Sequence, residues 1–130
     1  MDRKDYPVRS KKAKDNGTYC EKFVQYLLPG IEFIDSDVDA IYKGAPLEIK
    51  SCQMYVDAAD RPGGKRLGSF LFKGSQDKKV KEGNGRYVLL VKDGNRVVCS
   101  RIVLATRLFP DFEGRKSIMW NGAISAAEAC

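Results

Sequence analysis

The stretch Ser36–Ser51, SDVDAIYKGAPLEIKS, decides the fold because its pattern predicts two short strands joined by a tight turn. Apolar and charged residues alternate on both sides of Lys43-Gly44, and such a dipeptide suits a two-residue hairpin loop. In that register, Asp39 lies directly opposite Glu48. A three-residue turn over positions 43–45 would shift the register by one, so the turn length decides which side chains meet.

Side-chain alternation divides the second strand between two faces. Glu48 and Lys50 share a face with Asp39, whereas Ile49 points the other way, toward a core. Opposed side chains lie about 5 Å apart, so the two carboxylates repel each other unless a cation offsets their charge. Mg²⁺ prefers oxygen ligands, and a nearby lysine can stabilise charge developing on a phosphate. The pattern predicts a metal-assisted site; the alternative is a solvated face on which Asp37 and Lys50 form a surface ion pair.

The composition excludes several kinds of catalytic site. The 130-residue chain contains no histidine, so Ser-His-Asp and Cys-His nucleophilic sites and histidine-based zinc sites are ruled out within it. A net charge of +6 favours a polyanionic partner, of which nucleic acid is the first candidate. The four cysteines lack CxxC spacing and are expected to be reduced. We expect a soluble, cytoplasmic protein without membrane contact.

The order of elements predicts an α/β fold with a mixed central sheet flanked by helices. Residues 1–15 are expected to form a flexible basic arm, and residues 16–130 a single domain. A helix is predicted from Asn16 to the Pro29-Gly30 stop signal. Strands are predicted at 31–34, 38–42, 47–51, 67–72, 87–92 and 96–100, and short helices at 74–81 and about 101–108. Residues 53–66 are expected to form a long mobile loop, and the tail from residue 117 is left unassigned.

Asp39 followed by Glu48-Ile49-Lys50 resembles the core motif of the PD-(D/E)xK nuclease superfamily, an acid at a strand start and then an acid-x-lysine strand. Gly17–Glu21, GTYCE, resembles the first-helix glutamate motif of archaeal Holliday junction resolvases. The resemblance covers about residues 17–91 and implies a restriction-endonuclease-like fold. Val38 stands where the nominal motif has proline, and the eight residues between Asp39 and Glu48 are fewer than in the resolvases. An alternative alignment uses Asp37 in place of Asp39.

The resemblance implies a role for each residue of the core motif. Asp39 and Glu48 would bind the metal ion, with Ile49 as a further metal-binding position, and Lys50 would be the catalytic lysine. We expect Mg²⁺ as the cofactor, with Mn²⁺ able to substitute.

Two residues outside the core motif complete the predicted catalytic set. Glu21 would lie at the metal, directly or through water, and Gln76 would lie near the site on the helix that follows the core strands. The alternatives are a first-turn acid that complements the helix dipole at Glu21 and a solvent-facing helix residue at Gln76.

The predicted function is that of a Mg²⁺-dependent endodeoxyribonuclease that acts as a homodimer on structured DNA, as a junction resolvase does. Alternatives are a restriction-type enzyme that reads bases in a groove and a non-catalytic basic DNA-binding module. An RNA substrate also stays open, because basic charge reports phosphate and not sugar. The residues expected to contact nucleic acid are Lys11, Lys12, Lys14, Arg61, Lys65, Arg66 and Lys73.

Overall fold

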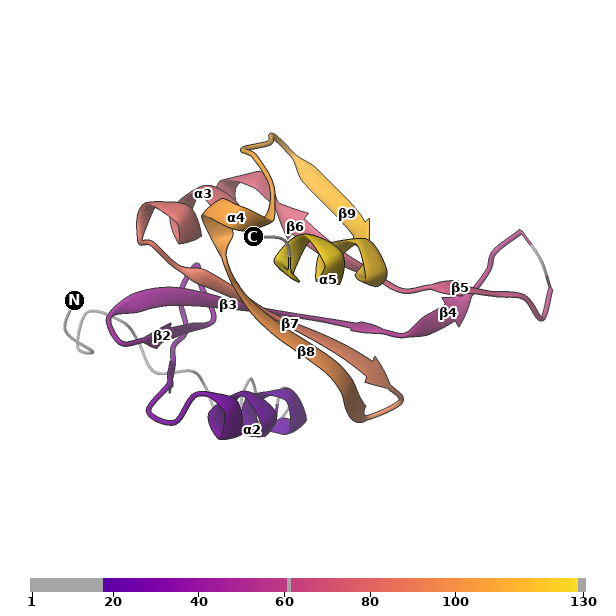
Figure 1. Ribbon diagram of the computed structural model, residues 1–130, viewed down its shortest axis with the longest axis horizontal. Coiled ribbons are helices and arrows are strands. Elements are labelled where there is room, and N and C mark those ends of the chain that lie inside the picture. Colours follow the sequence, from indigo (N-terminus) through magenta and orange to yellow (C-terminus); the bar gives the residue numbers. More distant parts are fainter. Residues whose placement is uncertain (1–17, 61, 129–130) are drawn as a thin grey trace.

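The computed structural model describes residues 18–60 and 62–128 (Figure 1). The expected basic arm over residues 1–15 lies outside the described residues. The elements are, in chain order, α2 (Thr18–Leu27), β1 (Glu32–Phe33), β2 (Ala40–Tyr42), β3 (Ala45–Gln53), β4 (Tyr55–Asp57), β5 (Lys65–Leu67), β6 (Ser69–Lys73), α3 (Gly74–Glu82), β7 (Arg86–Asp93), β8 (Arg96–Leu104), α4 (Ala105–Leu108), β9 (Arg115–Met119) and α5 (Trp120–Glu128).

A five-stranded mixed sheet forms the centre of the fold, with strand order β1-β2-β3-β7-β8. β3 and β7 are parallel, and the other neighbouring pairs are antiparallel. β7 is the strand most deeply buried, because Tyr87 to Val91 are all enclosed by layers on both faces. The predicted α/β class with a mixed sheet flanked by helices is confirmed.

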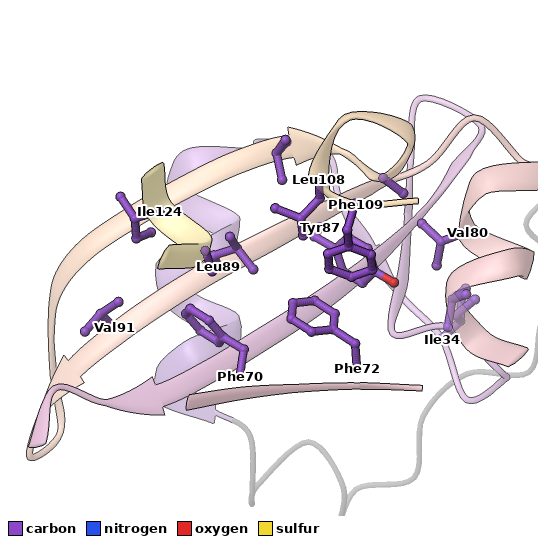
Figure 2. Packing of buried hydrophobic residues seen from close by; sticks show 14 residues of the cluster. Ile34, Phe70, Phe72, Val80, Tyr87, Leu89, Val91, Leu108, Phe109 and Ile124 are labelled. Atoms are coloured by element: carbon purple, nitrogen blue, oxygen red, sulfur yellow. The ribbon is translucent and has the colours of Figure 1, made fainter. Parts of the chain in front are cut away.

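Helices cover both faces of the sheet (Figure 1). On one face, Val24 of α2 packs with Ala40, Leu47 and Val88 in one hydrophobic cluster. On the other face, α3, α4, α5 and the β6–β9 pair enclose a larger cluster. Figure 2 shows the packed side chains of this larger cluster, among them Phe70, Phe72, Tyr87, Leu89, Phe109 and Ile124. The sheet is therefore covered on both sides, and Glu48 of β3 lies between packed layers, whereas Ser51 further along the strand is exposed.

The predicted hairpin forms in the predicted register. Tyr42 pairs with Ala45, and Ala40 pairs with Leu47. Lys43 and Gly44 both have positive φ, 51° and 81°, which is the backbone of a type I′ turn. The two-residue turn, and not a three-residue one, sets which side chains oppose each other.

Three predictions about secondary structure were wrong. Residues 53–66 are not a long loop, because β4 and β5 pair there as an antiparallel ribbon that extends away from the sheet (Figure 1). β8 continues to Leu104, so the helix predicted from residue 101 is reduced to α4. β2 begins at Ala40 and not at residue 38. The unassigned tail contains α5 and the end of β9.

The described residues include no helix long and apolar enough to cross a membrane. Among the described residues, Cys20, Cys52 and Cys99 are free cysteines, and Cys130 lies outside them.

Candidate active site

The β2–β3 hairpin brings the carboxyl groups of Asp39 and Glu48 together. Asp39 immediately precedes β2, and its backbone N–H donates a hydrogen bond of 3.1 Å to Glu48 Oε1. In return, the backbone N–H of Ile49 donates a hydrogen bond of 2.9 Å to Asp39 Oδ2. Each acid is therefore positioned by the backbone of the opposite strand, which fixes both carboxyl groups before any ligand binds.

Glu48 is an acid enclosed by the fold, with only 2% of its surface exposed. The pKa of Glu48 is raised to about 9, first by burial and then by a side-chain hydrogen bond with Asp39 and electrostatic repulsion from it. The positive charge of Lys50 and the backbone hydrogen bond from Asp39 act in the opposite direction. The pair therefore keeps a proton at neutral pH when no metal cation is bound. A hard divalent cation would offset the repulsion between the two carboxylates, because such ions prefer oxygen ligands.

Lys50 lies two residues further along the same face of β3. Its Nζ donates a hydrogen bond of 3.2 Å to Gln76 Oε1 and lies 5.7 Å from the centre of the Phe72 ring. Gln76 in turn donates from Nε2 to the backbone carbonyl of Asp37, at 3.0 Å. The half-buried Gln76 therefore links Lys50 to the segment that leads into β2, and it is not simply a solvent-facing helix residue.

The ion pair between Asp37 and Lys50, which belongs to the alternative of a solvated hairpin face, does not form. The Asp37 carboxylate pairs with Lys79 of α3 instead. The hairpin register does not extend back to Asp37, because β2 begins at Ala40 and the preceding residues leave the ladder. Asp37 and Asp39 thus point to different partners, and only Asp39 contacts Glu48.

A buried polar network beside the site was not predicted from the sequence. Tyr87 is the β7 residue paired with Glu48, and its hydroxyl donates a hydrogen bond of 2.7 Å to Asp77 Oδ1. Asp77, only 1% exposed, also forms an ion pair of 2.8 Å with Lys81. Burial raises the pKa of Tyr87 above its usual range. The network attaches α3, and with it Gln76, to β7, the strand beside Glu48. The four-residue spacing of Asp77 and Lys81 on a predicted helix is the sequence signal that could have indicated their ion pair.

The remaining predicted residues are distributed away from this cluster. Glu21 lies half-buried in the first turn of α2, the helix that packs on the opposite face of the sheet. Within residues 18–60 and 62–128, no three Asp, Glu or Cys side chains gather into a metal-binding group, so Glu21 does not join Asp39 and Glu48 in one. Its predicted role stays a prediction.

The predicted nucleic-acid contacts are only partly described. Lys65 and Arg66 are exposed on β5, where Lys65 pairs with Asp57, and Lys73 is exposed at the end of β6 beside α3. The other predicted contacts lie outside the described residues; they are Lys11, Lys12, Lys14 and Arg61.

A family model for the PD-(D/E)XK nuclease superfamily domain matches residues 7–127. The chain belongs to the PD-(D/E)XK nuclease superfamily. Its mixed sheet flanked by helices is accordingly a restriction-endonuclease-like fold. Nucleases of this superfamily generally use divalent metal ions and act on DNA. Among curated proteins, none matches the chain.

Proposed function

We propose that this PD-(D/E)XK nuclease is a Mg²⁺-dependent endodeoxyribonuclease that hydrolyses phosphodiester bonds at the Asp39–Glu48–Lys50 cluster. The observation that carries the proposal is the cross-strand pair of carboxyl groups, with a lysine on the same face of β3. Carboxylates, cation and lysine together supply what phosphoryl transfer needs, which is charge neutralisation and precise positioning.

The donor set around Asp39 and Glu48 fits Mg²⁺. This ion is usually bound by one or two carboxylates, and water and substrate phosphate oxygens complete the shell. The N–H of Ile49 points to Asp39, and the N–H and C=O of one strand residue share a direction. The carbonyl oxygen of Ile49 therefore leaves β3 on the same side as Asp39, which supports Ile49 as a third protein ligand.

A bound Mg²⁺ supplies Lewis-acid polarisation of the scissile phosphate and lowers the pKa of a water molecule. The protein residues have separate tasks. Asp39 and Glu48 would hold the cation, and Lys50 would orient the nucleophile and stabilise negative charge that develops on the phosphate. Gln76 holds the Lys50 ammonium at the cluster through its 3.2 Å hydrogen bond. Burial of Glu48 strengthens the electrostatic contacts of its carboxyl group, while Lys50 and Gln76 stay half-buried and open to a substrate.

The preferred substrate in this proposal is structured DNA cleaved by a homodimer, as in the resolvase-like enzymes that the motifs resemble. The chain is small, so a second copy would supply the second cut of a symmetric product. The basic side chains at Lys65, Arg66 and Lys73 would contribute phosphate contacts that make binding salt-dependent.

The β4–β5 ribbon favours a second candidate, a restriction-type enzyme that reads duplex DNA. A two-stranded ribbon fits the major groove, which is about 12 Å wide. Its root is firmly attached: the carbonyl of Met54 accepts hydrogen bonds from Gly68 N at 3.2 Å and from Trp120 Nε1 at 2.8 Å. Tyr55, which is 58% exposed, projects from this ribbon. The ribbon could therefore present side chains to base edges in a fixed direction.

Cleavage of matched substrates tests the proposal and separates its two candidates. A synthetic four-way junction, a linear duplex and a single strand of the same sequences would be incubated with Mg²⁺, with EDTA as the blank. Symmetric nicks confined to the junction would support the resolvase-like enzyme, and cuts at fixed duplex sequences would support the restriction-type enzyme. Binding without cleavage of any substrate would contradict the nuclease proposal and favour the non-catalytic module.

A further inference from the structure

A cavity of about 180 Å³ adjoins the candidate active site and is not used by the proposed catalytic set. It is lined by Asp37, Lys73, Ser75, Gln76 and Lys79. Gln76 belongs to both places, because it lines the cavity and accepts the hydrogen bond from Lys50. The cavity is therefore one side chain away from the catalytic lysine.

The lining carries the chemistry of a phosphate site. Lys73 and Lys79 provide two ammonium groups, and Ser75 provides a hydroxyl donor. Phe72, which contacts the Lys50 ammonium through its ring, directly precedes Lys73 in the chain. β6 and α3 thus carry the cavity and the surroundings of Lys50 on one continuous segment.

We propose that this cavity binds a DNA phosphate that neighbours the scissile phosphate on the same strand. The inference rests on the proposed nuclease function and adds a substrate-binding subsite to it. Lys73 and Lys79 bind the non-bridging oxygens, and Ser75 donates a hydrogen bond. A phosphate held there sets the register of the strand, so that the next phosphodiester lies at Asp39 and Glu48.

Asp37 opposes phosphate binding in the same cavity. Its carboxylate forms the ion pair with Lys79, and both side chains are largely exposed. An incoming phosphate must therefore displace the Asp37 carboxylate from Lys79. Removal of the Asp37 charge should strengthen DNA binding, which is the opposite of what removal of a metal ligand does to cleavage.

The chain offers a matched control for Lys79 on the same helix. Lys78 is the adjacent residue and also exposed, but it lines a different cavity, beside Asp111 and Phe112. Lys78→Gln and Lys79→Gln remove the same charge from neighbouring positions of α3. If DNA were bound only by general electrostatic attraction, the two substitutions would lower DNA affinity equally. If the cavity is a phosphate site, Lys79→Gln lowers DNA affinity and Lys78→Gln does not.

The first measurement is binding of a fluorescent DNA duplex by anisotropy, in EDTA and at several salt concentrations. Lys79→Gln is expected to weaken binding about tenfold and to reduce the salt slope by about one. Lys78→Gln is expected to change affinity less than about twofold. Asp37→Asn is expected to tighten binding several-fold relative to Asp35→Asn, which makes the same charge change two residues away. Equal effects of the two lysine substitutions would overturn the site, whether or not DNA is cut.

The second measurement places the bound phosphate. Single methylphosphonates, which lack the phosphate charge, would be introduced one at a time on each side of the mapped cut. At one neighbouring position, the methylphosphonate should reduce cleavage by wild type about tenfold. The same methylphosphonate should have little further effect on cleavage by Lys79→Gln, which has already lost that phosphate contact. Additive losses at every position would overturn the inference. Specific binding through Lys79 with no cleavage by any form would instead overturn the nuclease proposal and retain the phosphate site.

Discussion

Replacement of Glu48 by glutamine is predicted to stabilise the metal-free fold at neutral and alkaline pH while it abolishes the proposed activity. Glutamine has nearly the shape of the protonated carboxylic acid. Its oxygen can accept the backbone hydrogen bond from Asp39, and its amide can donate to the Asp39 carboxylate as the acid proton does. The substitution therefore keeps the hydrogen bonds of the buried pair and removes the need to bury a second negative charge.

The size of the effect follows from the raised pKa of Glu48. The pKa of this carboxyl is 4.5 ordinarily and about 9 in the fold, so between these values the unfolded chain loses a proton that the folded chain retains. Because the folded state then binds more protons, stability falls as pH rises, by about 1.4 kcal/mol per pH unit. Between pH 5 and pH 8 this group removes roughly 4 kcal/mol from the free energy of unfolding. Glu48→Gln does not titrate and escapes that loss.

The assay is urea unfolding at 25 °C in EDTA, from pH 5 to pH 9, followed by the fluorescence of Trp120, the single tryptophan of the chain. Wild type and Glu48→Gln should be similar near pH 5 and diverge steadily as pH rises. Glu82→Gln, at an exposed position, controls for the change in charge. Addition of Mg²⁺ should raise the stability of wild type at pH 8 and leave Glu48→Gln unchanged. Parallel stability curves for the two proteins would refute the assignment of Glu48 as the buried, proton-holding acid.

Three further substitutions test the architecture around the site. Gly68→Ala should destabilise the fold by about 3 kcal/mol in urea unfolding, because the new Cβ would lie 1.9 Å from the carbonyl oxygen of Gln53. Gly122→Ala in α5, where the new Cβ would lie 3.7 Å from the nearest atom, in the side chain of Ile118, should be neutral or stabilising. A similar loss at both glycines would contradict the account of the ribbon root. Tyr87→Phe should cost about 1.5 kcal/mol because Asp77 loses a hydrogen bond, and an unchanged urea midpoint would mean that the network does not stabilise α3.

The hairpin that carries Asp39 and Glu48 could be predicted because its signals are local. Alternation fixes which residues share a face, and Lys43-Gly44 fixes the turn and hence the register. The prediction failed where the ladder stopped. Nothing in the sequence near Asp37 shows that the strand begins at Ala40, so the register was extended three pairs beyond Ala40–Leu47, the last pair of the ladder, to place Asp37 opposite Lys50.

The β4–β5 ribbon and the end of β8 could not be predicted because contacts with distant residues decide them. β4 and β5 are three residues each in a polar, glycine-containing segment, and the ribbon root depends on hydrogen bonds from Trp120, far along the chain. Residues 101–104 are apolar enough for either a helix or a strand, and pairing with β7 selects the strand. The hydrogen bond of Tyr87 with Asp77 is likewise tertiary, whereas a place for Gln76 near Lys50 was expected from the family resemblance.

The most direct test of the proposed catalytic cluster is Mg²⁺-dependent DNA cleavage by wild type beside Lys50→Ala and Glu48→Gln, on whichever substrate of the matched panel wild type cuts. Lys78→Ala serves as the charge control, and DNA binding in EDTA is measured for every protein. The account predicts that wild type and Lys78→Ala cleave and that both cluster variants lose at least about a hundredfold in rate while they still bind DNA. Cleavage by Lys50→Ala or Glu48→Gln at the wild-type rate would contradict it.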